Sequence, residues 1–231
     1  EKVDNLTDLS VKIKMVPPVE QWIDGKLNVG QIHEVNIEDL LDRTPIQIDN
    51  PVIQKELKGK TILITGAAGS IGSEIAHQIS NYDYKYLILL DQAESDLYDL
   101  QQDFNRNEIK NFTVELADIR NTQRIDHIFE SYDIDLVFHA AAYKHVPLME
   151  SNPYEAVRVN IYGTSLLMNF AIKNNVKKFI MVSTDKAVNP TNVMGATKRI
   201  AEIYANCLNV EGKTKFVTTR FGNVLGSNGS V

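Results

Sequence analysis

The sequence has one cysteine, Cys207, among 231 residues. A single cysteine excludes an intrachain disulfide and any metal site that needs several thiolates. We interpret Cys207 as a buried structural thiol rather than a nucleophile, because it lies in a helical pattern at residues 200–208. We predict no metal site, and a reducing cytosolic setting fits this composition.

Long apolar runs and an excess of basic charge are also missing. No run is long enough to span a bilayer, and no signal peptide opens the chain. Acidic residues outnumber basic ones by 30 to 24, which gives a net charge of -6. A general nucleic-acid binder would normally present a basic face. We therefore expect no nucleic-acid partner and no membrane contact from these residues.

The two ends of the chain differ from its middle. The chain opens without methionine, enters a strand-like run at 11–16, and closes in a glycine-rich loop at 226–231. We expect it to be a fragment of a larger protein. Residues 1–58 are predicted to be the tail of a preceding domain plus a linker, with an independent module as the alternative. Residues 59–231 are predicted to form one domain that is incomplete at its carboxyl end.

From residue 59, short aliphatic runs alternate with segments of helical spacing. The predicted strands cover residues 61–65, 86–90, 112–116, 136–139, 178–182 and 215–219. The predicted helices cover residues 71–80, 93–106, 121–131, 153–174 and 194–209. Apolar strands separated by helices are typical of a parallel sheet covered on both faces. We predict a doubly wound, Rossmann-like α/β fold, which binds ligands beyond the carboxyl ends of its strands.

A glycine-rich turn follows the first of these strands. Gly66 permits a tight turn, Gly69 lets the backbone approach a pyrophosphate, and Gly72 lets helix and strand pack closely. The helix then opens at Ser70 and Ile71, where backbone N–H groups and the helix dipole favour a phosphate. The turn predicts a dinucleotide site.

Two acidic positions extend this site. Asp91 ends the second strand, where a carboxylate accepts hydrogen bonds from ribose hydroxyls and repels the extra phosphate of NADP. It therefore predicts NAD, although Asp91 could equally cap the helix that starts near Ala93, or do both. Asp118 and Ile119 follow the third strand and could flank the adenine. A polar loop position accounts for Asp118 nearly as well.

A second group of residues indicates acid–base chemistry. Thr184, Asp185 and Lys186 follow the fifth strand at its carboxyl end. Met194 and Lys198 are four residues apart in the next helix and therefore face the same side. The alternative is that Asp185 and Lys186 form an ordinary solvated ion pair.

These motifs resemble the extended short-chain dehydrogenase/reductase superfamily, and within it the nucleotide-sugar dehydratases and epimerases. The matching residues are the glycine turn, the run His139-Ala140-Ala141-Ala142, Asn160, Ser183-Thr184 and Lys198. Longer strings at 142–150, 183–190 and 220–224 resemble the polysaccharide-biosynthesis branch that contains UDP-N-acetylglucosamine 4,6-dehydratases. The resemblance covers residues from about 59 to 231.

The resemblance implies an NAD-dependent hydro-lyase that converts a UDP-sugar, most specifically UDP-N-acetylglucosamine, to its 4-keto-6-deoxy form. Hydride leaves C4 of the sugar, water is lost across C5 and C6, and hydride returns to C6, so the cofactor is used catalytically. Lys186 would be the base at C5 and Asp185 the acid for the C6 hydroxyl, with shifted pKa values in both. Thr184 would orient the C4 hydroxyl.

Met194 departs from the superfamily, where this position is usually a tyrosine. A thioether cannot take or give a proton at neutral pH. Large membrane-anchored members of the dehydratase branch carry methionine here, so Asp185 or a bridging water would accept the first proton. Lys198 would bind the nicotinamide ribose, and Ala140 and Ala141 would line the cofactor.

The remaining implied contacts concern the substrate. Tyr143, Lys144 and His145 would lie near the sugar and its diphosphate, and Asn223 would contact the UDP portion. Asn160 would be structural as much as catalytic. The resemblance also implies a homo-oligomer and a parent protein tethered to the cytoplasmic face of a membrane. A C4 epimerase and a non-catalytic nucleotide-sensing domain are the competing interpretations.

Overall fold

The computed structural model describes residues 14–15, 33–34, 51–222 and 224, and its contacts divide the chain into two units. The first unit is Glu1–Asp49. It contains β1 (Lys14–Met15) and β2 (His33–Glu34), which pair antiparallel with Lys14 opposite Glu34. The predicted strand-like run at 11–16 is therefore confirmed at residues 14–15. The second unit, Asn50–Val231, contains the remaining elements.

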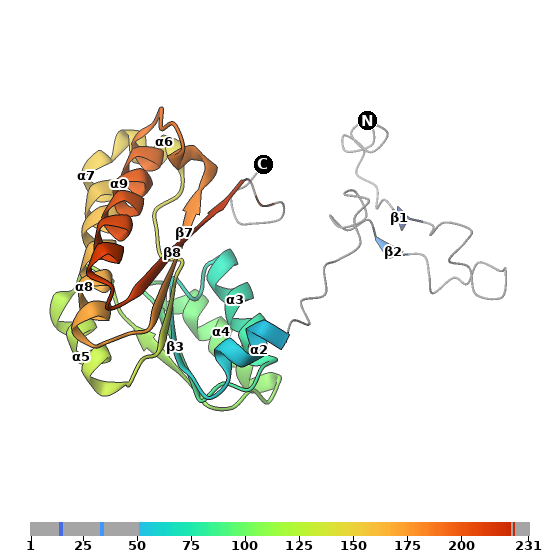
Figure 1. Cartoon of the computed structure of the whole chain (residues 1–231). Helices are drawn as coiled ribbons and strands as arrows, with labels where there is room; N and C mark the ends of the chain where they lie inside the picture. The colour runs from blue at the N-terminus through green and yellow to red at the C-terminus, as the bar shows by residue number, and fades with distance from the viewer. Residues whose placement is uncertain (1–13, 16–32, 35–50, 223, 225–231) are drawn as a thin grey trace. The chain divides into compact units, whose positions relative to one another are not determined.

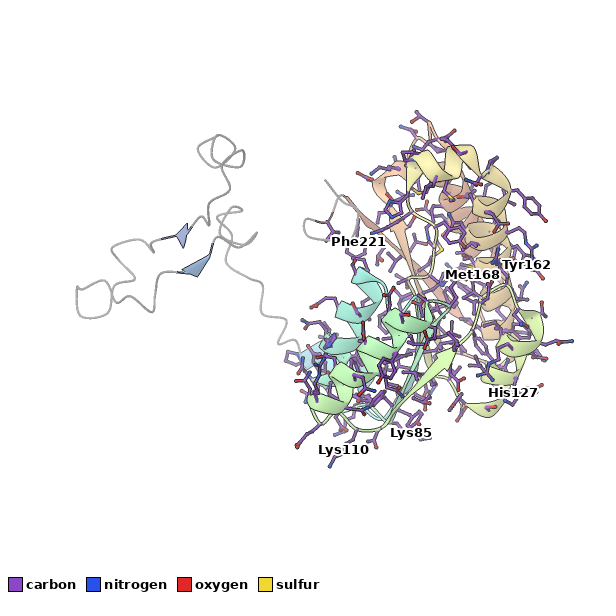
Figure 2. All side chains as sticks on the ribbon, turned by 180° about the vertical axis from the view of Figure 1, so that it is seen from behind. Lys85, Lys110, His127, Tyr162, Met168 and Phe221 are labelled. Carbon is purple, nitrogen blue, oxygen red and sulfur yellow. The ribbon has the colours of Figure 1, made fainter. Side chains whose placement is uncertain are left out.

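The second unit is built on a six-stranded parallel sheet in the order β5-β4-β3-β6-β7-β8. The strands are β3 (Thr61–Thr65), β4 (Tyr86–Asp91), β5 (Phe112–Leu116), β6 (Leu136–His139), β7 (Lys178–Thr184) and β8 (Lys215–Phe221). The strand order reverses between β3 and β6, which is where a doubly wound sheet opens a ligand crevice. Lys85 and Lys110, just before β4 and β5, lie at the opposite end of the sheet from Phe221, which ends β8 (Figure 2).

Helices cover both faces of this sheet (Figure 1). One face holds α2 (Pro51–Leu57), α3 (Ser70–Ser80) and α4 (Glu94–Arg106), and the other holds α5 (Thr122–Ser131), α8 (Thr164–Lys173) and α9 (Val193–Leu208). Successive side chains of a strand point to opposite faces. Thus Ile62 and Ile64 pack in one apolar cluster and Leu63 in the other, all fully buried. The predicted doubly wound α/β fold is confirmed.

The long helix predicted at 153–174 is confirmed as a continuous helical run over residues 153–173, with a π-helical stretch in its middle. It contains α7 (Pro153–Ala156), the π-helical η4 (Val157–Gly163) and α8, and a short helix α6 (Val146–Ser151) precedes it. A side-chain carbon on Gly163 would come within 2.8 Å of Ile119 Cδ1, so this stretch lies hard against the loop after β5. π-helical turns are frequent at functional sites, and Asn160 lies in this one.

Three expectations are wrong in detail. Cys207 is exposed, because it falls on the outer side of α9, whose inner side buries Ala201, Ala205 and Leu208. Residues 51–57, assigned to a linker, form α2, and Leu57 is buried in the same cluster as Ile62. Strands β7 and β8 also run to Thr184 and Phe221, two residues farther than predicted.

Candidate active site

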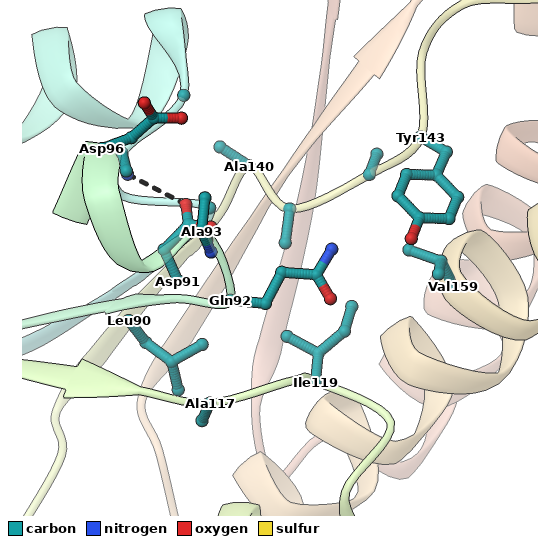
Figure 3. Close-up of a pocket in the computed structure, with 15 residues that line it drawn as sticks. Leu90, Asp91, Gln92, Ala93, Asp96, Ala117, Ile119, Ala140, Tyr143 and Val159 are labelled. Carbon is teal, nitrogen blue, oxygen red and sulfur yellow. Dashed lines mark hydrogen bonds between the residues drawn. The ribbon is translucent and has the colours of Figure 1, made fainter.

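Two adjoining cavities lie at the carboxyl ends of the strands. The larger has a volume of ≈ 820 Å³ and reaches from the glycine turn to the end of β7 and the start of α9. The smaller, of ≈ 190 Å³, lies beside the end of β4 (Figure 3). They share the glycine turn and the loop after β6; the common residues are Gly66, Ala68, Gly69, Asp96, Ala140, Ala142 and Tyr143. The larger volume is in the range of small-molecule and cofactor sites.

The glycine turn is shaped by backbone contacts. Gly66 has φ of 72°, and a side-chain carbon there would come within 2.6 Å of Ala141 Cα. A side-chain carbon on Gly72 would come within 2.7 Å of the Gly66 carbonyl carbon. Helix α3 begins at Ser70 after an N-cap glycine, Gly69, that gives it no side-chain cap. An uncapped helix start is a good place for an anion, so the turn fits the diphosphate of a dinucleotide.

Asp91 accepts two backbone hydrogen bonds, one of them at the start of the helix that the sequence expected it to cap. Its Oδ1 accepts a hydrogen bond from Ala93 N at 3.0 Å, at the start of α4. Its Oδ2 accepts one from Ala68 N at 2.9 Å, which ties the end of β4 to the glycine turn. Each carboxylate oxygen has a second lone pair, so Asp91 can still accept from ribose hydroxyls. It lines the smaller cavity.

Of the two residues predicted to flank the adenine after β5, Ile119 lines a cavity and Asp118 does not. Ile119 lines the smaller cavity and faces it beside Tyr143 (Figure 3). Asp118 does not line either cavity. Its carboxylate pairs with Arg120 at 2.7 Å, and this pairing lowers the pKa of Asp118. Arg120 also reaches Glu155 at 2.6 Å. The arrangement supports Ile119 as an adenine-facing residue and does not support Asp118 in that role.

His139, at the end of β6, holds the next stretch of the site. Its ring is fully buried between two hydroxyls, with Nδ1 2.7 Å from Thr65 Oγ1 and Nε2 2.9 Å from Thr164 Oγ1. Burial lowers the pKa of His139 to about 3, so the ring is neutral. The strand end thus fixed leads directly to Ala140 and Ala141, which line the smaller cavity as expected.

Asn160 is fully buried and does not line either cavity. Its Oδ1 accepts from Tyr143 N at 2.9 Å, and its Nδ2 donates to Tyr143 O at 3.0 Å and to Thr197 Oγ1 at 3.1 Å. The expected contact with substrate is therefore not supported. Asn160 instead links the loop after β6 to α9, because its amide oxygen and both donors of its amide nitrogen form hydrogen bonds to these two elements.

The loop that Asn160 holds forms one wall of the larger cavity. Tyr143 lies where the two cavities meet, and exposed Lys144 and His145 follow it toward the mouth. Leu148 and Phe221 add apolar surface to the same wall and rim. Asn223, predicted to contact the UDP portion, lies outside the described residues.

Thr184, Asp185 and Lys186 form a compact polar turn. Thr184 ends β7, and the 3-10 turn η5 (Asp185–Ala187) follows. Thr184 Oγ1 donates to Asp185 Oδ1 at 3.0 Å, and Lys186 Nζ lies 3.4 Å from the same oxygen. Thr184 and Lys186 line the larger cavity, whereas Asp185, which lies between them in the turn, lines neither cavity. A side-chain carbon on Gly222 would come within 3.8 Å of Asp185 Oδ2, so the end of β8 lies beside this turn.

The charge state of Asp185 differs from the expectation. The hydrogen bond from Thr184, followed by the interactions with Lys186, lowers the pKa of Asp185 below its ordinary value. The sequence interpretation required a raised pKa, so that the acid would hold a proton near neutral pH. In this structure the carboxylate is ionised, because its side chain is 58% exposed and its neighbours donate to it.

Helix α9 brings the last two predicted residues to the site. Asn192 caps the helix through Gly195 N at 2.8 Å, and a side-chain carbon on Gly195 would lie 3.1 Å from the Lys186 carbonyl carbon. The helix therefore packs directly on the turn that holds Lys186. Met194 is 5% exposed, lines the larger cavity and packs with Met149. It supplies an apolar wall at the position where a tyrosine would supply a hydroxyl.

Lys198 lines the larger cavity one turn after Met194. It is 5% exposed, and this burial lowers the pKa of Lys198 to about 8, while the charge of Glu202 acts in the opposite direction. Sequence reasoning identified Lys198 but missed Glu202. The sequence could have indicated Glu202, because a residue four positions after Lys198 lies on the same side of the helix.

Gln92 and Asp96, which line the smaller cavity, were also missed. The sequence could have indicated them, because Gln92 directly follows β4 and Asp96 lies in the first turn of α4, the helix that comes after this strand. Among the described residues, no group of three or more His, Cys, Asp or Glu side chains could hold a metal ion. Nor does that part of the chain contain a helix long and apolar enough to cross a membrane.

Comparison with known proteins shows the family to which the chain belongs. Residues 62–231 match the family model described as polysaccharide biosynthesis protein. The chain belongs to this family. It is 49% identical over 225 residues to the capsular polysaccharide biosynthesis protein CapD of Staphylococcus aureus, covering 96% of this chain and 37% of that protein.

Two further relatives extend the range of reactions. A UDP-N-acetylglucosamine 4,6-dehydratase (inverting) of Campylobacter jejuni is 40% identical over 177 residues, which is 75% of this chain and 52% of that enzyme. The solved UDP-glucose 4-epimerase of Thermotoga maritima with UDP-glucose is 28% identical, with a TM-score of 0.65, covering 72% of this chain and 56% of that one. The chain thus spans only about a third to a half of these relatives.

Proposed function

We propose that this chain is the cofactor-binding and catalytic part of an NAD-dependent UDP-sugar 4,6-dehydratase, with UDP-N-acetylglucosamine as the substrate, in polysaccharide biosynthesis. One observation supports this most strongly. Thr184 and Lys186 face the same cavity as the glycine turn and Lys198, so proton-transfer groups lie beside a dinucleotide cradle. The similarity to a named 4,6-dehydratase agrees with this arrangement.

The cradle fits NAD through this chain's own groups. The backbone at the start of α3 would hold the diphosphate, and Asp91 would hold the adenosine ribose, where its charge disfavours the extra phosphate of NADP. Lys198, buried at the far wall, would bind the nicotinamide ribose. NAD, when bound, supplies an acceptor that takes a hydride from the sugar and gives it back.

The ionised state of Asp185 supports a role for this carboxylate as the proton acceptor that Met194 cannot be. Oxidation at C4 releases the proton of the C4 hydroxyl, and Asp185 is an ionised carboxylate able to take it, next to the orienting hydroxyl of Thr184. Asp185 is then the protonated acid that the second step needs. It gives that proton to the C6 hydroxyl, which leaves as water.

Lys186 completes the balance of protons. As a neutral amine it removes the proton at C5, made acidic by the C4 ketone, while the C6 hydroxyl departs. It returns a proton to C5 when hydride arrives at C6.

A C4 epimerase is the second candidate, because a solved relative carries that name. An epimerase also oxidises C4 but returns hydride to the same carbon, and it needs no acid–base pair for elimination. Asp185 and Lys186 therefore favour the dehydratase. A non-catalytic nucleotide sensor would account for Met194 but not for a cavity that keeps Thr184, Lys186 and Lys198 together.

Mass spectrometry of UDP-N-acetylglucosamine incubated with NAD and the full-length protein tests the proposal. Loss of one water from the sugar nucleotide is the expected result. An unchanged mass with a new epimer would assign the protein to the epimerases, and an untouched sugar nucleotide in the presence of bound NAD would favour the sensor.

A further inference from the structure

Glu202 is a buried carboxylate at the back of the site. It lies on α9 one turn after Lys198 and is 1% exposed. Burying a carboxylate is costly unless hydrogen bonds and opposite charge compensate it. Ser183 Oγ donates to Glu202 Oε1 at 2.7 Å. The mechanism above does not use Glu202, so its burial calls for another explanation.

Two arginines complete its surroundings. Arg220 Nε donates to Oε1 at 2.8 Å and Nη2 to Oε2 at 2.6 Å, and Arg199 Nη1 donates to Oε2 at 3.2 Å. Burial by itself raises the pKa of Glu202, but the bonds from Arg220, Ser183 and Arg199 outweigh it and lower the pKa to about 2. The carboxylate is therefore ionised at every working pH.

Its partners lie at the ends of the strands that carry the chemistry. Ser183 directly precedes Thr184 on β7, and it is paired in the sheet with Arg220 on β8. Arg220 in turn lies two residues before Gly222, which is beside the Asp185 carboxylate. One carboxylate thus connects α9, β7 and β8 at the edge of the sheet where the larger cavity opens.

The same carboxylate acts on Lys198 through charge. It favours the ammonium form against burial. The other ionisable groups around Lys198 do not oppose this strongly, because His139 on β6 is neutral and the guanidinium groups of Arg199 and Arg220 are bound to Glu202. Lys186, on η5, lines the same cavity.

We propose that Glu202 is a positioning residue, which fixes the strand ends bearing Thr184 and Gly222 and holds Lys198 as an ammonium group for the cofactor ribose. This inference rests on the proposed use of NAD and goes beyond the dehydratase assignment. It gives Glu202 two separable effects, one on geometry and one on charge.

The test measures NAD affinity by calorimetry from pH 6 to pH 10 in the full-length protein and its variants. Binding should weaken as pH rises through the pKa of Lys198, because the ammonium form is the better donor to ribose oxygens. Glu202→Gln removes the negative charge, so this weakening should begin at lower pH. We call the pH at which half of this weakening has occurred the midpoint. Arg220→Gln removes a positive charge that neutralises Glu202, so the midpoint should stay the same or move to higher pH.

A purely structural role would move both variants in the same direction. Glu115→Gln is the matched control, since Glu115 is also a shielded carboxylate paired with an arginine, Arg124, but lies on the edge strand β5. It should leave the midpoint unchanged. If Glu202→Gln does not fold, the Arg220→Gln profile decides alone, and a midpoint moved to lower pH would contradict the proposal.

The outcomes separate this inference from the proposed function. If Glu202→Gln binds NAD with the same pH midpoint as the wild-type protein, the proposed role of Glu202 is wrong. This result would not affect the dehydratase assignment. A shifted midpoint with no dehydrated sugar would support Glu202 and overturn the dehydratase. Absence of NAD binding in the wild-type protein would contradict both.

Discussion

The glycine turn and the Thr184–Lys186 turn lie on two sides of one cavity, but they are built differently. The first is fixed by backbone atoms in close contact, with Gly66 and Gly72 leaving no room for a side chain. The second is held by hydrogen bonds between exposed polar side chains, with Lys186 37% and Asp185 58% exposed. The glycine turn thus has its shape before any ligand arrives, and the Asp185 carboxylate is likewise already ionised, through the hydrogen bond from Thr184 and the interactions with Lys186.

The largest loss of stability should come from adding a side chain to Gly72, which lies against the carbonyl group of Gly66. Gly72→Ala would press a methyl group into the Gly66 carbonyl, where neither partner can move freely. Overpacking that forces the backbone to shift costs about 1–3 kcal/mol of stability, and occasionally more. Thermal denaturation of Gly72→Ala should show a large loss, together with loss of NAD binding.

Gly69→Ala is the matched control for this change. A side-chain carbon there would lie 3.4 Å from Gly66 O, which is an ordinary contact. Its melting temperature should remain close to wild type. Equal melting temperatures for the two variants would show that close packing does not fix the turn.

Removal of the proposed base should affect rate and not folding. Lys186→Ala should lower turnover of the UDP-sugar by about 10²–10⁴-fold, the usual contribution of a general base. The melting temperature should hardly change, because the side chain is substantially exposed. Single-turnover kinetics measure the rate, and Lys85→Ala, which changes an exposed lysine at the opposite end of the sheet, is the control that should keep the wild-type rate. A Lys186→Ala enzyme that keeps its rate would remove lysine from the mechanism.

A smaller effect is expected at Met194. Met194→Leu conserves volume and apolar character, so it should cost less than about 1.5 kcal/mol of stability. Turnover should fall by less than tenfold, since the thioether exchanges no proton. Chemical denaturation and steady-state rates measure both quantities. A large loss of rate with normal stability would mean that the sulfur itself takes part in catalysis.

The smallest effect concerns a pair far from the chemistry. His77 Nε2 lies 2.6 Å from Asp103 Oδ2, between α3 and α4. Burial lowers the pKa of His77, but the hydrogen bonds to Asp103 and Ser73 outweigh it, so the net shift is upward. The resulting stability is present below the unfolded pKa and is lost as pH rises through the folded pKa.

This pH dependence should be modest, because the pair is about one-third exposed. Unfolding free energies at pH 6 and pH 8 in wild type and His77→Gln measure it. The variant should lose the pH-dependent part and keep NAD affinity. If His77→Gln changes the NAD affinity, the pair of His77 and Asp103 is coupled to the cofactor site and not only to stability.

The sequence predicted the fold well where local pattern and burial agree. Strands β3, β5 and β6 begin and end where the apolar runs do, and β3 is buried along its whole length, whereas the edge strand β5 is only half-buried. The helix at 153–174 was predicted correctly, but its π-helical stretch, which accompanies the contact of Gly163 with Ile119, is not indicated by any spacing of apolar residues. Cys207 was misplaced for a related reason, since helix membership alone does not say which side is buried.

The site was predictable residue by residue where a motif specifies a backbone shape. Gly66, Gly72 and Asp91 lie where their spacing indicated. Partners distant in sequence were not predictable: Asn160 uses its amide on Tyr143 and Thr197, and Glu202 binds Arg220 across the sheet. The charge of Asp185 was also missed, because it depends on a hydrogen bond from Thr184 that only the fold defines.

The central claim is that hydride leaves C4 and returns to C6 of a UDP-sugar. It is tested most directly with UDP-N-acetylglucosamine deuterated at C4, incubated with NAD and the full-length protein, and followed by NMR and mass spectrometry. We predict a product that has lost one water and carries deuterium at C6. A product of unchanged mass with deuterium still at C4 would contradict the account and identify an epimerase.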